Sequence, residues 1–305
     1  MTSRTASDPL PPARSKTVRV RTRWDDCDRN GHVNNAAFAA LVRAAHDRAG
    51  LPDRPLRALT IAYREPVGPE VTIDVDVTIG EATATRQRVT YALRVDGRPA
   101  AYAEALWQVS PEPEIPPALP TLARDSDGRP FHFTQVVRSY QLGPDAVARP
   151  QAILQWLEHA VFRAAARAGW PAERMIDADF LSLVVEHRLV LGLPADEGDE
   201  LEIASRLIEL RRVSGVWHHE VRRPDGAIVA IDRARGAFLG LELGDLVFEV
   251  LDSDPVILPD GVDLDLLLRR QIRRFARVVD GFDAAEKFFV LVDAVVETGE
   301  FGVHF

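Results

Sequence analysis

The segment Arg48-Ala49-Gly50-Leu51-Pro52 recurs 119 positions later as Arg167-Ala168-Gly169-Trp170-Pro171. Each copy follows an alanine-rich stretch, and a glycine with a proline two positions later is a helix stop signal. We therefore predict one helix over about 35–49 and a second over about 150–168, each at the same place in a repeated unit.

Strand patterns follow both predicted helices in the same order. From Val71 to Ile79, apolar and polar residues alternate with the period of two that is typical of a half-buried strand. Two more strands, near 86–95 and 98–109, flank the hairpin turn Asp96-Gly97, and the second copy repeats this plan over 201–210, 215–222 and 227–239 around Asp225-Gly226. The second turn comes 129 positions after the first, which indicates about ten extra residues in the second copy, within about 172–199.

The repeat predicts an α+β fold of two similar modules. In each module a curved antiparallel sheet wraps one long central helix, because one helix cannot cover both faces of a flat sheet. We expect a disordered lead-in over 1–16, the first module over 17–112, a proline-rich linker over 113–130, the second module over 131–244, and a helical C-terminal extension over 245–305.

Composition excludes several classes of protein. The net charge of −9 argues against general nucleic-acid binding, and no apolar run approaches the roughly 18 residues of a membrane span. The single cysteine, Cys27, can form neither an internal disulfide nor a multi-cysteine metal site, and it predicts a cytoplasmic protein. His218-His219-Glu220 is not expected to bind a metal, because neighbours on a strand point to opposite faces. No nucleotide-binding glycine motif occurs, so we expect no metal and no cofactor.

The densest polar cluster lies between the first strand and the first helix, and reads Asp25-Asp26-Cys27-Asp28-Arg29-Asn30-Gly31-His32-Val33-Asn34-Asn35. Asn34 or Asn35 is suited to cap the helix. The free N–H groups at a helix start, together with the helix dipole, stabilise a developing negative oxygen. A carboxylate held nearby can attack a carbonyl or position water, so this cluster is the candidate active site.

This cluster resembles the signature of hotdog-fold thioesterases of the 4-hydroxybenzoyl-CoA thioesterase type. The spacing of Asp28, Asn30 and His32 is also similar to the catalytic set of the acyl-ACP thioesterases, which are tandem hotdog proteins. The resemblance implies that Asp28 is the nucleophile or the general base, and that the N–H near Asn35 polarises the thioester carbonyl. It also implies that Asn30 and His32 orient water or the carboxylate.

The second copy departs from this signature. Aligned on the helix ends, Asp145 falls at Asp26, Val147 at Asp28, Gln151 at His32 and Leu154 at Asn35, so the catalytic acid and histidine are absent there. In tandem hotdogs the two modules pair like the subunits of a dimer and the substrate lies along their interface. The resemblance therefore implies one working site and one degenerate site. Glu158 on the second helix is the candidate for a contribution from the opposing module, although a helix-face acid paired with Arg163 or water is the alternative.

Further substrate contacts are predicted at Asn34, Tyr63, Arg269 and Arg273. Asn34 belongs to the motif, and Tyr63 and His187 fall at similar places in the two copies, where core or rim positions are the alternative reading. Arg269 and Arg273 belong to five arginines on an amphipathic helix of the C-terminal extension. These arginines are either a solvated face or a dock for coenzyme A phosphates or an acidic carrier protein.

We therefore expect an acyl thioesterase that releases free acid and thiol from acyl-CoA or acyl-ACP. Coenzyme A or phosphopantetheine enters only as part of the substrate. The alternatives are a hotdog hydratase or dehydratase acting on enoyl or hydroxyacyl thioesters, and a non-catalytic acyl-thioester binding protein. The modules or the C-terminal helices are also surfaces through which copies of the chain could form a homo-oligomer.

Overall fold

The computed structural model describes residues 14–109, 130–177, 180–211 and 214–239. The first module contains one helix and five strands: β1 (Arg14–Arg21), α1 (Ala37–Arg48), β2 (Leu56–Tyr63), β3 (Thr72–Ala82), β4 (Arg86–Val95) and β5 (Arg98–Gln108). The second contains β6 (Phe131–Val136), α2 (Pro150–Arg167), α3 (Ala172–Asp177), β7 (Leu181–Leu191), β8 (Glu200–Arg211), β9 (Ser214–Arg222) and β10 (Ile228–Leu239). The helical C-terminal extension predicted over 245–305, with Arg269 and Arg273, lies outside the described residues, and the module boundaries remain predictions.

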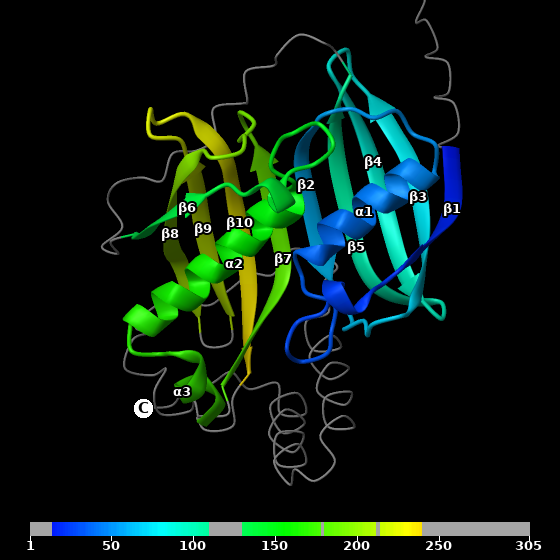
Figure 1. Cartoon of the computed structure of the whole chain (residues 1–305). Helices are drawn as coiled ribbons and strands as arrows, with labels where there is room; N and C mark the ends of the chain where they lie inside the picture. The colour runs from blue at the N-terminus through cyan, green and yellow to red at the C-terminus, as the bar shows by residue number, and fades with distance from the viewer. Residues whose placement is uncertain (1–13, 110–129, 178–179, 212–213, 240–305) are drawn as a thin grey trace, which may run out of the picture.

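The strands form one continuous antiparallel sheet in the order β1-β3-β4-β5-β2-β7-β10-β9-β8-β6. Each half of this order is the other half reversed, so the two modules share one topology. They join where β2 pairs with β7, with Thr60 opposite Arg188. Figure 1 shows each half of the sheet curving around its own helix, and α1 contacts α2 across the junction. The predicted double-hotdog architecture is confirmed.

Local sequence explains both helices. The apolar side chains of α1 recur at spacings of three and four, which directs one face into the core: Ala37, Phe38, Leu41, Val42 and Ala45. Both helices end before a glycine in the left-handed conformation, Gly50 at φ +76° and Gly169 at φ +87°. The repeated segment therefore marks two helix ends, as predicted.

Backbone pairing corrects the alignment of the two motif loops. An isolated bridge joins Cys27 to Val33 in the first module and Leu142 to Ala148 in the second, an offset of 115 rather than 119. The buried positions of the two helices match at the same offset. The helix ends misled the alignment because α2 has 18 residues and α1 has 12, so the longer helix ends later in its module.

A further change of offset follows the helices. Ile61 pairs with Ala103 in the first module as Leu189 pairs with Asp232 in the second, so β2 and β7 are offset by 128. The extra residues of the second copy therefore lie between the equivalent parts of α2 and β7. They form the additional end of α2 and the segment that contains α3.

Candidate active site

The motif loop is a compact turn between β1 and α1. A 3-10 turn, Trp24–Asp26, opens it, and the buried Asp26 carboxylate accepts the Arg23 N–H at 2.8 Å. The Cys27–Val33 bridge closes the loop, and Gly31 takes the left-handed conformation at φ +76° that its tip requires. Asp26 thus supports the loop, while residues 28–32 form its tip.

The Asp28 carboxylate is exposed at this tip and held by its neighbours. Its Oδ1 accepts the N–H of Asn30 at 2.8 Å and that of His32 at 3.4 Å. The Asn30 side-chain amide donates to Asp28 Oδ2 at 3.3 Å. Asn30 and the His32 backbone therefore orient the Asp28 carboxylate, which stays accessible to solvent.

Asn34 connects the motif loop to the second module. Its Oδ1 accepts the N–H of Ala36 at 2.8 Å, which helps to start α1. Its Nδ2 donates to Glu158 Oε2 on α2 at 2.9 Å. The predicted partner of Glu158, Arg163, instead lies over the rings of Phe131 and Phe133.

The start of α1 offers an N–H donor at Asn35. No acceptor for this N–H occurs among the described residues, whereas the N–H groups of Asn34 and Ala36 are bonded. The Asn35 carbonyl accepts a hydrogen bond from the hydroxyl of Tyr63 at 3.0 Å, so Tyr63 holds the Asn35 peptide group in place at the start of α1. Tyr63 is buried, and the structure places it as a support for Asn35.

Electrostatics distinguish the ionisable groups of the site. Burial raises the pKa of Glu158 above its ordinary value, and the charge of Asp28 adds to the rise. The bond from Asn34, the charge of His187 and the N–H of Ala36 oppose it. Burial, followed by the charges of Asp26 and Asp28, raises the pKa of the Cys27 thiol. A raised pKa suits Glu158 to accept a proton, and it disfavours Cys27 as a nucleophile.

The motif loop of the second module can be compared with that of the first at the corrected offset of 115. Gly143 stands at the position of Asp28, Asp145 at Asn30, and Val147 at His32. The backbone nevertheless repeats, because Gly143 N–H donates to the Val147 carbonyl as Asp28 N–H donates to His32, at 2.8 Å in both cases. The second loop therefore has the backbone shape of the first but lacks its carboxylate and its imidazole. The sequence predicted both absences, although it aligned the two loops at an offset of 119.

Sequence reasoning missed a buried pair close to this site. His187 Nδ1 donates to Asp232 Oδ2 at 2.8 Å, and both side chains are inaccessible to solvent. The His187 ring packs edge-on against Tyr63, with centroids 6.0 Å apart. Register also shows that His187 corresponds to Leu59 and not to Tyr63. An acid at Asp232, directly after the apolar run Ile228-Val229-Ala230-Ile231, was the available signal.

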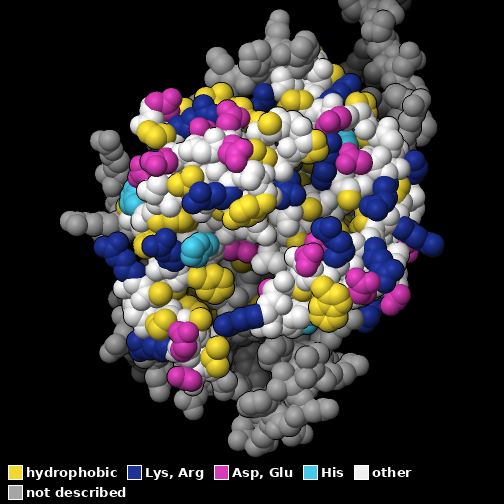
Figure 2. All heavy atoms as spheres, viewed as in Figure 1, with side chains coloured by type: hydrophobic (Ala, Val, Ile, Leu, Met, Phe, Trp, Pro, Cys, Tyr) yellow, Lys and Arg dark blue, Asp and Glu magenta, His cyan; other side chains and the backbone are white. Residues whose placement is uncertain are grey.

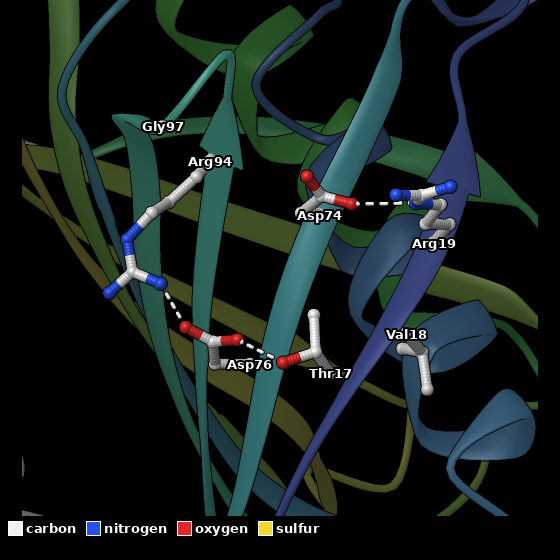
Figure 3. Close-up of a pocket in the computed structure, with 7 residues that line it drawn as sticks. All are labelled: Thr17, Val18, Arg19, Asp74, Asp76, Arg94 and Gly97. Carbon is white, nitrogen blue, oxygen red and sulfur yellow. Dashed lines mark hydrogen bonds and ion pairs between the residues drawn. The ribbon is translucent and has the colours of Figure 1, made fainter.

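The hollow drawn in Figure 3 lies elsewhere, on the face of β1, β3 and β4 opposite α1. Its charged side chains are paired: Arg19 with Asp74 at 3.0 Å, and Asp76 with both Arg94 and Thr17. Figure 2 shows basic and acidic side chains interspersed over both modules. Because the carboxylates of the hollow are engaged in ion pairs, it is an unsuitable place for catalysis.

Two further features concern ligands and membranes. Within the described ranges, no three His, Cys, Asp or Glu side chains are grouped so as to hold a metal ion, and His219 points away from His218 toward Ser205. Among the same residues, none of the helices is long and apolar enough to span a membrane.

Comparison with known structures shows the same fold. A putative oleoyl thioesterase from Lactobacillus plantarum is 13% identical, with a TM-score of 0.60 over 75% of this chain and 98% of that chain. An acyl-ACP thioesterase from Bacteroides thetaiotaomicron is 15% identical, with a TM-score of 0.53 over 74% and 98%. The 12:0-ACP thioesterase from Umbellularia californica is 12% identical, with a TM-score of 0.54 over 74% and 94%.

Family models match both modules. Residues 11–109 match the acyl-ACP thioesterase C-terminal domain, and residues 152–230 match the thioesterase superfamily. No curated protein sequence matches the chain. The two matched segments together span more than half of the chain, and each contains the helix of one module and most of its strands. Both modules thus match thioesterase models of the hotdog fold, and the chain is a thioester hydrolase whose first module is similar to the acyl-ACP thioesterases.

Proposed function

We propose that the single active site lies at the junction of the two modules and hydrolyses the thioester of an acyl carrier protein. The observation that supports this location is the bond from Asn34 to Glu158, which brings a carboxylate of α2 to the motif loop. The charge of Asp28 also contributes to the raised pKa of Glu158, which supports a single site with carboxylates from both modules.

Asp28 is the reacting carboxylate in this proposal. Acting on water, it takes one proton while the oxygen of water adds to the thioester carbonyl carbon. The carbonyl oxygen becomes an oxyanion, which the free N–H of Asn35 stabilises at the positive end of α1. Collapse breaks the carbon–sulfur bond, and the proton passes from Asp28 to the departing thiolate. In direct attack, an Asp28 oxygen adds to the carbonyl carbon and the carbon–sulfur bond breaks, which leaves an anhydride and a free thiolate. Water then cleaves the anhydride to the free acid and the Asp28 carboxylate, and the proton that water gives up goes to the thiolate.

The neighbouring residues orient these groups. Asn30 and the His32 backbone hold the Asp28 carboxylate, and Tyr63 holds the Asn35 peptide. Glu158, on α2, accepts a hydrogen bond from the water. Position 28 of the first module has no counterpart carboxylate in the second, so we assign one working site to each chain.

The carrier is proposed from the family match, since residues 11–109 match an acyl-ACP thioesterase domain. Thiol release should be measured on acyl-ACP and acyl-CoA substrates of graded chain length, with Asp28→Asn and the control Asp25→Asn. We expect free thiol with acyl-ACP as the better substrate, loss of release in Asp28→Asn, and activity retained in Asp25→Asn.

The same assay tests the alternatives. A change in enoyl absorbance without thiol would identify a hydratase, and tight acyl-thioester binding without turnover would identify a binding protein. Faster release from acyl-CoA than from acyl-ACP would overturn the proposed carrier while leaving the hydrolytic site in place.

A further inference from the structure

A row of buried polar residues crosses the inner face of the second module. Its members lie on adjacent strands β8, β9, β10 and β7: Ser205, His219, Asp232 and His187. Ser205 Oγ and His219 Nδ1 are 2.8 Å apart, as are Asp232 Oδ2 and His187 Nδ1. His219 stands opposite Asp232 in the β9–β10 ladder. The row ends on β7, the strand that joins the modules.

The first module has no such row at the equivalent positions. Register places Val77 at Ser205, Tyr91 at His219, Ala103 at Asp232 and Leu59 at His187. Tyr91 alone is polar there, and it bonds to His46 at 2.9 Å and to Trp107 at 3.1 Å. The same fold is therefore stable with leucine and alanine where the second module buries an imidazole and a carboxylate.

The buried pair is incompletely satisfied. Asp232 Oδ1 and His187 Nε2 have no hydrogen-bond partner among the described residues. Burying ionisable groups costs free energy, and replacement of a buried ion pair by apolar residues is often neutral or stabilising. The stability of the fold therefore does not account for the buried pair. Its position at the module junction indicates a role in the neighbouring active site.

His187 connects the row to the site residues on both modules. Its ring contacts Tyr63, which bonds the Asn35 carbonyl at the start of α1. Its charge also acts on Glu158, which bonds Asn34 at 2.9 Å. A positive charge on His187 would stabilise the Glu158 carboxylate against the effect of burial.

We propose that His187, held by Asp232, is a positioning residue that keeps Glu158 ionised and bound to Asn34 at the module junction. This inference rests on the proposed role of Glu158 in the active site. The charged or titratable groups around His187 are Asp232 on β10, Glu158 on α2, Glu186 on β7, Tyr63 on β2 and His219 on β9.

The balance of these groups favours the charged imidazole. Burial lowers the pKa of His187, but the charge and hydrogen bond of Asp232, followed by the charges of Glu158 and Glu186, raise it overall. Loss of either member of the pair therefore removes a positive charge beside Glu158. The Glu158 carboxyl then keeps its proton to higher pH.

The test compares pH profiles of kcat/KM for the full chain and its variants. Asp232→Asn removes charge while keeping size, and His187→Leu with Asp232→Ala copies the first module. We expect the acidic limb of the profile to move upward by about 1 pH unit in both. In the Glu158→Gln background, the limb should no longer respond to Asp232→Asn. The control Ser205→Val copies Val77 in the same row and should leave the limb unchanged.

Direct titration of Glu158 gives a second readout for variants with little activity. In protein labelled with ¹³C at the glutamate side-chain carboxyl, the Glu158 signal is the one that Glu158→Gln removes. The midpoint pH of its titration should rise in Asp232→Asn and in His187→Leu with Asp232→Ala. An unchanged midpoint with lowered thermal stability would show a structural role and overturn the inference. Full activity in Glu158→Gln would instead refute the proposed role of Glu158. Loss of thiol release in Asp28→Asn would still support the hydrolytic site in that case, so failure of this inference and failure of the proposed function can be told apart.

Discussion

Asn34 of the first module donates a 2.9 Å hydrogen bond to Glu158 of the second module. The same Asn34 side chain accepts the Ala36 N–H at the start of α1, so one amide orders the helix start and contacts the opposing helix. This bond couples the geometry of the motif loop to the packing of the modules.

The coupling should be measurable as a free energy. We expect a double-mutant cycle of Asn34→Ala and Glu158→Gln to give an interaction of about 1.5 kcal/mol, because hydrogen bonds to charged groups have this magnitude. Urea unfolding at pH 7 provides the measurement. Additive effects of the two substitutions would contradict the bond. Asn34→Ala with Glu173→Gln, an exposed acid on α3, is the control pair.

Asp28→Asn should lower kcat by at least about 100-fold, the usual contribution of a general base. Stability should change little because the side chain is exposed and the amide oxygen still accepts the Asn30 N–H. Single-turnover hydrolysis in H₂¹⁸O tests for direct attack. Heavy oxygen in the Asp28 carboxylate indicates an anhydride that water cleaves at the aspartyl carbon.

His219 predicts a stability loss in mild acid. Burial lowers its pKa to about 4, below the ordinary value of 6.5. The unfolded chain therefore binds a proton before the folded chain does, and the contribution is fully present above pH 6.5 and lost as pH falls through about 4. Over this window the free energy of unfolding should fall by up to about 1.4 kcal/mol per pH unit.

Urea unfolding between pH 7 and pH 4.5 tests this expectation. His219→Gln should show a shallower decline than the unmodified chain. His159→Gln, which replaces an exposed histidine of α2, should retain the original slope. Equal slopes in all three proteins would show that His219 titrates normally.

Cys27 should prove dispensable although it lies inside the motif. Burial and the adjacent Asp26 and Asp28 raise the pKa of its thiol, so little thiolate exists at neutral pH. We expect Cys27→Ala to keep most of its activity and the native thiol to react slowly with iodoacetamide. Rapid alkylation with parallel loss of thiol release would indicate a nucleophilic cysteine instead.

The sequence by itself determined the two long helices, the strands that follow each of them, the repeat and the cluster of Asp28, Asn30 and His32. Helix stops, strand alternation and turn signals are local properties, and these three residues lie within five positions of each other. The correct alignment of the two motif loops could not be predicted from the sequence. Helix length differs between the modules, and the offset is revealed only by the backbone bridges.

The tertiary structure alone decided which distant groups meet. Asn34 and Glu158 are 124 positions apart, and His187 and Asp232 are 45 apart. Their contacts arise from the β2–β7 pairing and from the ladder register of β7 with β10. A strand sequence shows which face a residue takes but not which residue stands beside it on the next strand. The buried pair was therefore invisible until the sheet was assembled.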